Sequence, residues 1–112
     1  MKVRLVLAAA AIAALPAFAR AQHQGHAGMS GSDQAYTDAH QTMMGTMQAK
    51  PTGDADRDFA AMMIPHHQGA IDMARVQLQH GKDPELRRMA QKMIDDQERE
   101  IAELRAWQQK NR

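Results

Sequence analysis

Two clusters of helix-breaking residues divide the chain after residue 31 into three stretches. Pro51, Thr52 and Gly53 form the first cluster, and Gly81 and Pro84 bracket the second. Proline lacks a backbone N–H and glycine favours chain reversals, so a helix is expected to end at each cluster. Connections this short favour neighbouring helices that run in opposite directions. The sequence therefore predicts an all-α fold, an antiparallel three-helix up-down bundle over residues 32–112.

N-terminal capping residues indicate where each helix should begin. Ser and Asp side chains accept hydrogen bonds from the free backbone N–H groups of a first helical turn. The first helix is expected to run to about Lys50 and the second to about Gly81. The expected caps are, in chain order, Ser32, then Asp54 or Asp56, and finally Asp83, with Pro84 as the first helical residue.

Each predicted helix carries one apolar stripe with a spacing of three or four residues. The stripes are Tyr36, His40, Met43 and Met47; then Phe59, Met63, His66, Ala70, Met73 and Ala74; then Leu86, Met89, Ala90, Met93, Ile94, Gln97, Ile101, Leu104 and Gln108. The third stripe is predicted to be buried. No alternating strand pattern competes with the helical periodicity.

The first 21 residues have the pattern of a secretory signal peptide. A positive start (Met1–Arg4) precedes a short apolar run and two small-x-small cleavage patterns that end at Ala19 and Ala21. The run is too short for a transmembrane helix, and no second run of spanning length follows. We therefore expect export to the periplasm or beyond, with a flexible tail over 22–31 and no membrane span in the mature chain.

Composition excludes several classes of protein. The chain has no cysteine, so neither a disulfide nor a thiolate ligand is available. Loss of Lys2, Arg4 and Arg20 with the signal peptide reduces the 14 basic residues to 11, against 13 acidic ones. No block of Lys and Arg remains, which argues against nucleic acid as a partner.

Residues 62–74 combine two adjacent histidines with three methionines on one predicted helix. Nine of the chain's ten methionines follow Met1. Imidazole and thioether together are the ligands of a soft metal, above all copper, so His66, His67 and Met63 are candidate ligands. Reversal of the chain at 51–53 and again near Gly81 should bring further candidates to the same level. These are His40, Met43 and Met44, with Gln97 across the bundle as a partner that orients a ligand histidine.

Plainer interpretations of these residues remain open. The methionines could be core, an interior histidine could be hydrogen-bonded, and His80 suits the C-terminal end of a helix dipole. Adjacent histidines point about 100° apart on a helix, so His66 and His67 cannot be equivalent. Pro65 could kink a continuous helix or start a new one. Zinc or nickel could bind through histidine alone, although copper fits the methionines better.

The tail offers a second, weaker set of ligands. His23, His26 and Met29 lie in a segment without apolar periodicity, and ordering such a segment around a metal ion costs conformational entropy. A solubilising tail is the alternative interpretation. No metalloprotease, di-iron or serine-nucleophile motif is present, so the chain is not expected to be an enzyme.

The segments DFAAMMIPHHQGAIDMA and GKDPELRRMAQKMIDDQEREIAELRAWQ, within residues 58–108, closely resemble the DUF305 family of exported helical proteins. The resemblance implies a ferritin-like four-helix fold and copper binding in the periplasm through Met and His, and it favours His66, His67, Met63 and Met73. Many relatives repeat the helical hairpin, so a homodimer could complete the four-helix core here.

We therefore predict an exported copper-binding protein that buffers, sequesters or delivers copper, with a copper-handling protein as a further partner. The alternative is a structural or interaction module without metal, whose methionine-rich surface docks a partner helix.

Overall fold

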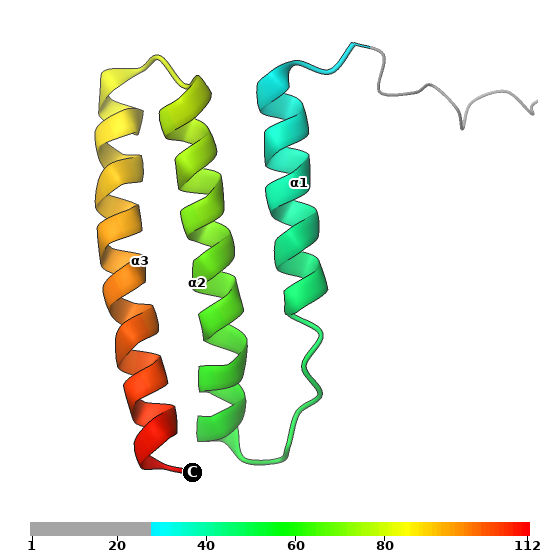
Figure 1. Cartoon of the computed structure of the whole chain (residues 1–112), viewed down its shortest axis with the longest axis vertical. Helices are drawn as coiled ribbons and strands as arrows, with labels where there is room; N and C mark the ends of the chain where they lie inside the picture. The colour runs from blue at the N-terminus through cyan, green and yellow to red at the C-terminus, as the bar shows by residue number, and fades with distance from the viewer. Residues whose placement is uncertain (1–27) are drawn as a thin grey trace, which may run out of the picture.

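The computed structural model describes residues 28–112, and these form three helices without any strand: α1 (Gly31–Thr46), α2 (Ala55–His80) and α3 (Pro84–Lys110). The prediction of an all-helical chain is confirmed. Figure 1 shows α2 between α1 and α3, with the loop 47–54 at one end and the loop 81–83 at the other. Within the described residues both outer helices contact α2 but do not contact each other, so the helices form a single layer.

The caps of α2 and α3 follow the prediction. Asp54 accepts hydrogen bonds from the backbone N–H groups of Asp56 and Arg57, and Asp83 accepts one from Leu86. These interactions are local, because each cap satisfies N–H groups within three residues of itself. Asp54, rather than Asp56, is therefore the cap of α2.

The ends of α1 differ from the prediction. Ser30 caps the helix instead of Ser32. The Ser30 hydroxyl accepts from the Asp33 backbone N–H, and the Asp33 carboxylate accepts from the Ser30 backbone N–H, which completes a reciprocal capping box. The helix ends at Thr46 instead of near Lys50. The last backbone hydrogen bond of the helix runs from the Met47 N–H to the Met43 carbonyl, and the Thr46 hydroxyl also donates to the carbonyl oxygens of Thr42 and Met43.

The largest apolar cluster lies between α2 and α3. Its buried members are Ile71, Ala74, Ala90, Ile94 and Ile101, with Ile64 and Leu78 packed against them. The guanidinium of Arg87 on α3 donates to the carbonyl oxygens of Leu78 and Gly81, which ties the two helices together at their loop. The pairing of α2 with α3 is thus stabilised by an apolar cluster along the helices and by the Arg87 hydrogen bonds beside their loop.

Helix α1 packs on α2 through a close approach at Gly69. A Cβ atom added to Gly69 would lie 2.5 Å from Cγ and Sδ of Met43, so the absence of a side chain makes room for this methionine. Ala39 is buried beside it, and the Tyr36 hydroxyl donates to Gln77 Oε1 at 3.1 Å. The contact uses the side of α2 that faces away from α3.

The stripe predicted to be buried on α3 is only partly covered, which corrects that prediction. Ala90, Ile94 and Ile101 are buried, but Leu86 and Met89 are about half exposed. The reason is the position of α1: it lies beside α2 and leaves the groove between α2 and α3 open. A covered stripe would require a further element over that groove.

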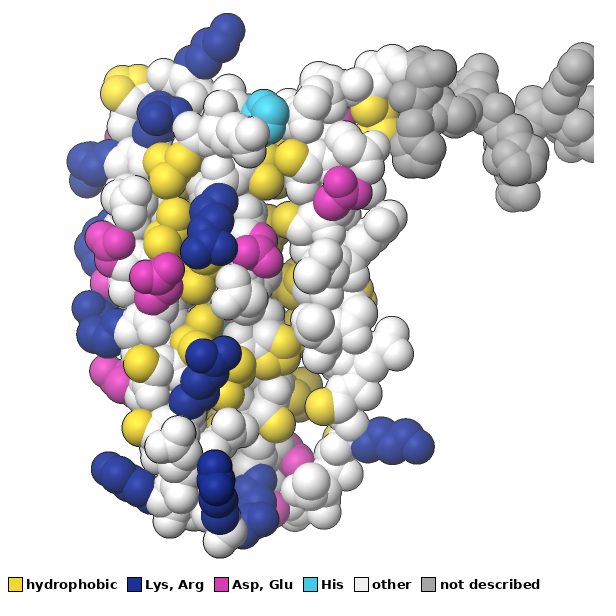
Figure 2. All heavy atoms as spheres, in the orientation of Figure 1, with side chains coloured by type: hydrophobic (Ala, Val, Ile, Leu, Met, Phe, Trp, Pro, Cys, Tyr) yellow, Lys and Arg dark blue, Asp and Glu magenta, His cyan; other side chains and the backbone are white. Residues whose placement is uncertain are grey.

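The layer therefore has two unlike faces. Arg75 pairs with Asp72 and with Glu98 of α3 on one face, and charged side chains gather over α2 and α3 on the face seen in Figure 2. Residues about half a helical turn away lie on the opposite side. This second surface is called the methionine face here, and it comprises Tyr36, His40, Met44, Phe59, Met62, Met63, His66, Met73, Leu86, Met89, Met93 and Leu104.

Pro65 lies inside a continuous helix. Because α2 runs from Ala55 to His80, the interpretation of Pro65 as the first residue of a new helix is wrong. Its ring removes one hydrogen bond and frees the carbonyl of Ala61, one turn before the histidines. None of the helices within residues 28–112 combines the length and apolarity that crossing a bilayer requires.

Candidate metal centre

His67 occupies the α2–α3 interface, with its side chain 16% exposed. Its Nε2 lies 2.7 Å from Oε2 of Glu100 on α3. A carboxylate can only accept a hydrogen bond, so we assign the proton to Nε2, and Nδ1 then presents an unshared electron pair. This Nδ1 atom is buried and has no hydrogen-bond partner within the described part of the chain. An acceptor nitrogen in that position suits a positive ion.

A groove of about 510 Å³ surrounds this histidine. Met63 lies one turn before His67 on α2, and both residues line the groove together with Leu104 and Trp107 of α3. Thioether and imidazole therefore line one groove, together with the carboxylates of Asp56, Glu100 and Glu103. Among residues 28–112 no three His, Asp or Glu side chains converge into a metal-binding group.

His67 pairs with the carboxylate of Glu100, and not with the amide of Gln97, which was the partner predicted from the sequence. The amide oxygen of Gln97, one turn earlier on α3, is buried without a hydrogen-bond partner in residues 28–112. Sequence reasoning did not single out Glu100 as a site residue. The sequence does contain a sign of this role. Glu100 follows Met93 and Gln97 on the stripe of α3 that was predicted to be buried, and a charged side chain on such a stripe needs a specific partner.

His66 points out of the interface and is exposed on the methionine face. The ring centroids of His66 and His67 are 6.0 Å apart with an interplanar angle of 62°. The two imidazoles are therefore adjacent but not equivalent, as their positions on a helix predict. Met73, two turns after His66, lies half-buried on the same face.

The structure does not bring the α1 candidates to His67. Met43 packs on Gly69, two residues from His67 and therefore on nearly the opposite side of α2. His40 and Met44 are exposed on the outer helix. Of the tail candidates, Met29 is described and exposed, whereas His23 and His26 lie outside the described residues.

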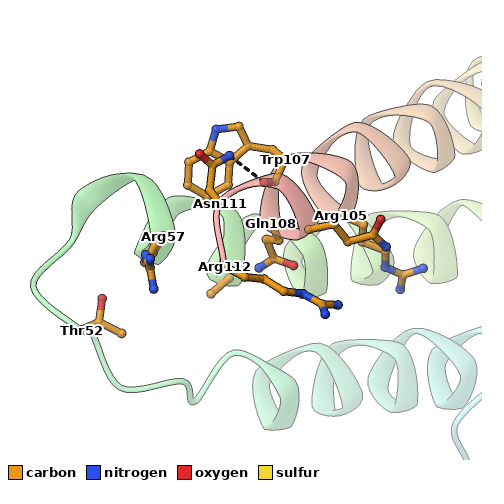
Figure 3. A pocket seen from close by; sticks show the side chains of 9 residues that line it. Thr52, Arg57, Arg105, Trp107, Gln108, Asn111 and Arg112 are labelled. Atoms are coloured by element: carbon orange, nitrogen blue, oxygen red, sulfur yellow. Dashed lines mark hydrogen bonds between the residues drawn. The ribbon is translucent and has the colours of Figure 1, made fainter.

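A second pocket, of about 450 Å³, lies between the loop 47–54 and the C-terminal end of α3. Arg57, Arg105 and Arg112 line it together with Thr52 and Gln108 (Figure 3). Positive charge therefore gathers at this end of the layer, away from the histidines. One of the three guanidinium groups is paired, since Arg57 lies 3.4 Å from the carboxylate of Asp54.

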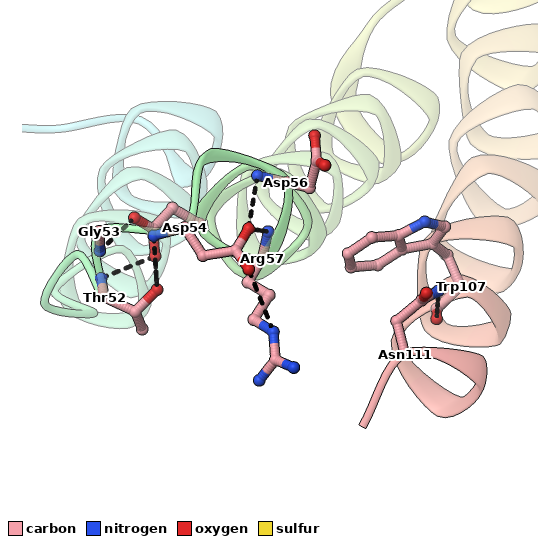
Figure 4. A network of polar contacts seen from close by, with 8 residues as sticks. Thr52, Gly53, Asp54, Asp56, Arg57, Trp107 and Asn111 are labelled. Atoms are coloured by element: carbon pink, nitrogen blue, oxygen red, sulfur yellow. Dashed lines mark hydrogen bonds and ion pairs between the residues drawn. The ribbon is translucent and has the colours of Figure 1, made fainter.

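A polar network beside this pocket fixes the loop. Thr52 donates to the Asp58 carboxylate from its backbone N–H at 2.8 Å and from its hydroxyl at 2.7 Å, and Gly53 adds a third hydrogen bond. Figure 4 shows Thr52 and Gly53 turned toward the first turn of α2, where Asp54 pairs with Arg57. Hydrogen bonds from Thr52 hold the pKa of Asp58 below its ordinary value. Gly53 has φ +91°, a conformation that favours glycine.

A layer of three helices with an imidazole–thioether groove defines a small all-helical protein with a candidate site for a soft metal. The chain belongs to the DUF305 family, because the family model, described as a domain of unknown function, matches residues 8–108. This match confirms the predicted resemblance and includes all of α1 and α2 and most of α3. A comparison with curated proteins finds no match.

Proposed function

We propose that this protein is exported and binds copper through imidazole and thioether groups, to buffer, sequester or deliver the ion without catalysing a reaction. The observation that carries the proposal is the buried Nδ1 of His67, which has no hydrogen-bond partner among residues 28–112, while the other ring nitrogen pairs with Glu100. Histidines that bind metals usually donate their second N–H to a carboxylate, which fixes the ring and strengthens it as a ligand.

The donor atoms favour copper over other ions. Thioether sulfur binds soft Cu(I), and imidazole binds both Cu(I) and Cu(II), so Met63 and His67 suit either oxidation state. Zinc or nickel would use the histidines and leave the methionines without a role. In this proposal His67 and Met63 form the groove site, Glu100 orients His67, and Met43 packs α1 against α2. His66, Met73, His40 and Met44 are the remaining candidate ligands.

The proposal extends to location and assembly. The signal peptide predicted over residues 1–21 would direct export, and a copper-handling protein would supply or receive the ion. We also propose that the three helices form an antiparallel up-down layer of ferritin-like type, which a second copy completes into a two-layered helical core. A layer with one apolar face left open supports this view, since domains are built from packed layers.

Competition for Cu(I) tests the proposed function. The mature protein is titrated against a chromogenic Cu(I) chelator, beside His67→Ala and the matched control His80→Ala at the exposed end of α2. We expect the wild type and His80→Ala to withdraw equal amounts of copper, and His67→Ala to withdraw less by about one ion per chain. Equal copper uptake by all three proteins, or no uptake by any, would exclude the groove site.

The exposed apolar side chains favour one alternative function. Phe59 is 60% exposed and Leu86 51%, which suits a module that docks a partner helix without metal. Capture of one periplasmic protein in the presence of a chelator, abolished by Leu86→Glu but not by His67→Ala, would support this alternative over copper binding.

A further inference from the structure

We propose that the pocket between the loop 47–54 and the C-terminal end of α3 binds a phosphate group, and that Arg57, Arg105 and Arg112 hold its oxygens. The ligand is a molecule that carries a phosphate, either a small soluble ester or the headgroup of a phospholipid. Among its lining residues the pocket shares only Trp107 with the groove at His67. The inference does not depend on the proposed binding of copper.

The two helices bring the arginines to one pocket. Arg105 and Gln108 are three residues apart on α3, so their side chains leave the same side of that helix. Arg112 follows just beyond the end of α3, and Figure 3 shows its side chain extended back along the last turns of the helix, toward Arg105 and Gln108. Arg57 reaches the same pocket from the first turn of α2. Three guanidinium groups therefore surround one space.

The positive charge of the pocket is only partly balanced. None of its lining residues is Asp or Glu, although Asp54 and Asp56 line a smaller pocket beside it. Arg57 lies 3.4 Å from Asp54, but both side chains are about half exposed, and such a pair is weak. Neither Arg105 nor Arg112 has an ion-pair partner among residues 28–112, whether a side chain or the terminal carboxylate. An excess of about two positive charges remains, and a phosphate ester at neutral pH carries about 1.5–2 negative charges.

The donor groups suit a phosphate better than other small anions. All three cations are arginines, and a guanidinium group presents a planar fork of N–H groups that pairs with two phosphate oxygens at once. The side-chain amides of Gln108 and Gln109 line the same pocket and offer neutral N–H donors. Its volume of about 450 Å³ is typical of pockets for small molecules, so Ala61 and Trp107 can contact the organic part of the ligand.

Internal hydrogen bonds already hold the walls of the pocket. Thr52 and Gly53 of the loop both donate to the carboxylate of Asp58. On the α3 side, the amide of Asn111 donates to the carbonyl oxygen of Trp107 at 2.8 Å (Figure 4). A pocket with an ordered backbone loses little conformational entropy when it binds, so the arginine side chains are the main groups that a ligand must immobilise.

Isothermal titration of the mature protein with glycerol phosphate at low salt tests the site. The wild type should bind it saturably, and added sodium chloride should weaken the binding. Arg105→Gln should weaken it by about tenfold or more, because charge-assisted hydrogen bonds are lost. Arg88→Gln is the matched control, since it removes another exposed arginine of α3 that lies outside the pocket, and it should leave the affinity unchanged. His67→Ala should also bind like the wild type, which separates this site from the copper site.

Flotation with phosphatidylglycerol vesicles distinguishes the two sources of the phosphate. Binding of glycerol phosphate without binding to vesicles assigns a soluble ester, and vesicle binding that Arg105→Gln abolishes assigns a lipid headgroup; either result supports the site. Circular dichroism checks that the variants remain helical. The inference is overturned if neither glycerol phosphate nor the vesicles bind, or if Arg105→Gln and Arg88→Gln bind them alike. Succinate that binds as tightly as glycerol phosphate also overturns it, because the pocket would then recognise charge and not phosphate.

Discussion

The close approach of Met43 to Gly69 makes the substitution Gly69→Ala a test of how α1 docks. The added Cβ would lie 2.5 Å from Cγ and Sδ of Met43 and 2.8 Å from its Cβ. Cβ and Cγ are near the backbone, so Met43 cannot relieve the overlap by moving only the end of its side chain. Either α1 shifts away from α2 or Met43 changes rotamer.

Two opposing effects determine the magnitude. Alanine is favoured over glycine inside a helix by about 1 kcal/mol. Overpacking at a close contact costs about 1–3 kcal/mol. We therefore expect Gly69→Ala to lower the free energy of unfolding by about 1 kcal/mol, which corresponds to a fall of about 4–8 °C in Tm for a domain of this size.

A double-mutant cycle separates the two effects. In a Met43→Ala background the overlaps with Cγ and Sδ are gone, whereas the Cβ of residue 43 still lies 2.8 Å from the added Cβ, so Gly69→Ala should lower Tm by less than it does in the wild type. Gly45→Ala serves as the matched control, since nothing lies within 4 Å of its added Cβ, and it should raise Tm in both backgrounds. Thermal unfolding followed by circular dichroism measures all the variants. If Gly69→Ala stabilises the wild-type chain, Met43 does not pack at Gly69 and the described docking of α1 is wrong.

Three further predictions concern the site, the loop and the proline. Glu100→Gln should weaken copper binding in the groove by about 10–100-fold, because His67 loses its carboxylate partner, whereas Glu98→Gln should not; competitive titration measures both. Asp58 has a lowered pKa, so its contribution to stability is present above pH 3.8 and is lost as the pH falls through the folded-state value. Urea unfolding should therefore show Asp58→Asn destabilised at pH 7 and less so at pH 2, and Glu103→Gln close to the wild type at both; equal stability of Asp58→Asn and wild type at pH 7 would contradict this. Pro65→Ala restores a hydrogen bond inside α2 and should raise Tm; a fall in Tm would show that the proline is needed where it lies.

Local signals predicted the helices because the interactions that start and stop them are themselves local. Asp54 and Asp83 cap helices that begin at the next residue, and Pro84 takes the first helical position as expected. The first helix was harder to place. Ser30 and Ser32 are both suitable caps, and only the acidic residue three positions after Ser30 decides between them.

The arrangement of the helices could not be predicted from periodicity. An apolar stripe shows that a face is suited to burial, but not which element covers it. The position of α1 depends on the fit of Met43 against Gly69. In the sequence alone, Gly69 indicates only a weak preference for helix and does not show that another side chain packs there. Leu86 and Met89 were consequently expected to be covered and are not.

Only the part of the candidate site that depends on a single helix was predictable from the sequence. The 100° rotation between successive residues is a property of any helix, so the unequal roles of His66 and His67 followed from the sequence. Glu100 is 33 residues away from His67, and their contact depends on the register of α2 against α3. A register error of one turn is enough to replace Glu100 by Gln97, which is the partner that the sequence suggested.

The open methionine face also has a consequence for oxidation. Met44, Met62, Met89 and Met93 are between 39% and 52% exposed, whereas Met43 packs against Gly69. Peroxide converts an accessible thioether into a sulfoxide, which is polar and can be reduced enzymatically. The exposed methionines should react first, and their conversion would make this face hydrophilic before the contact between α1 and α2 is damaged. The layer would then keep its helices while this face became polar, and reduction of the sulfoxides would restore its apolar character.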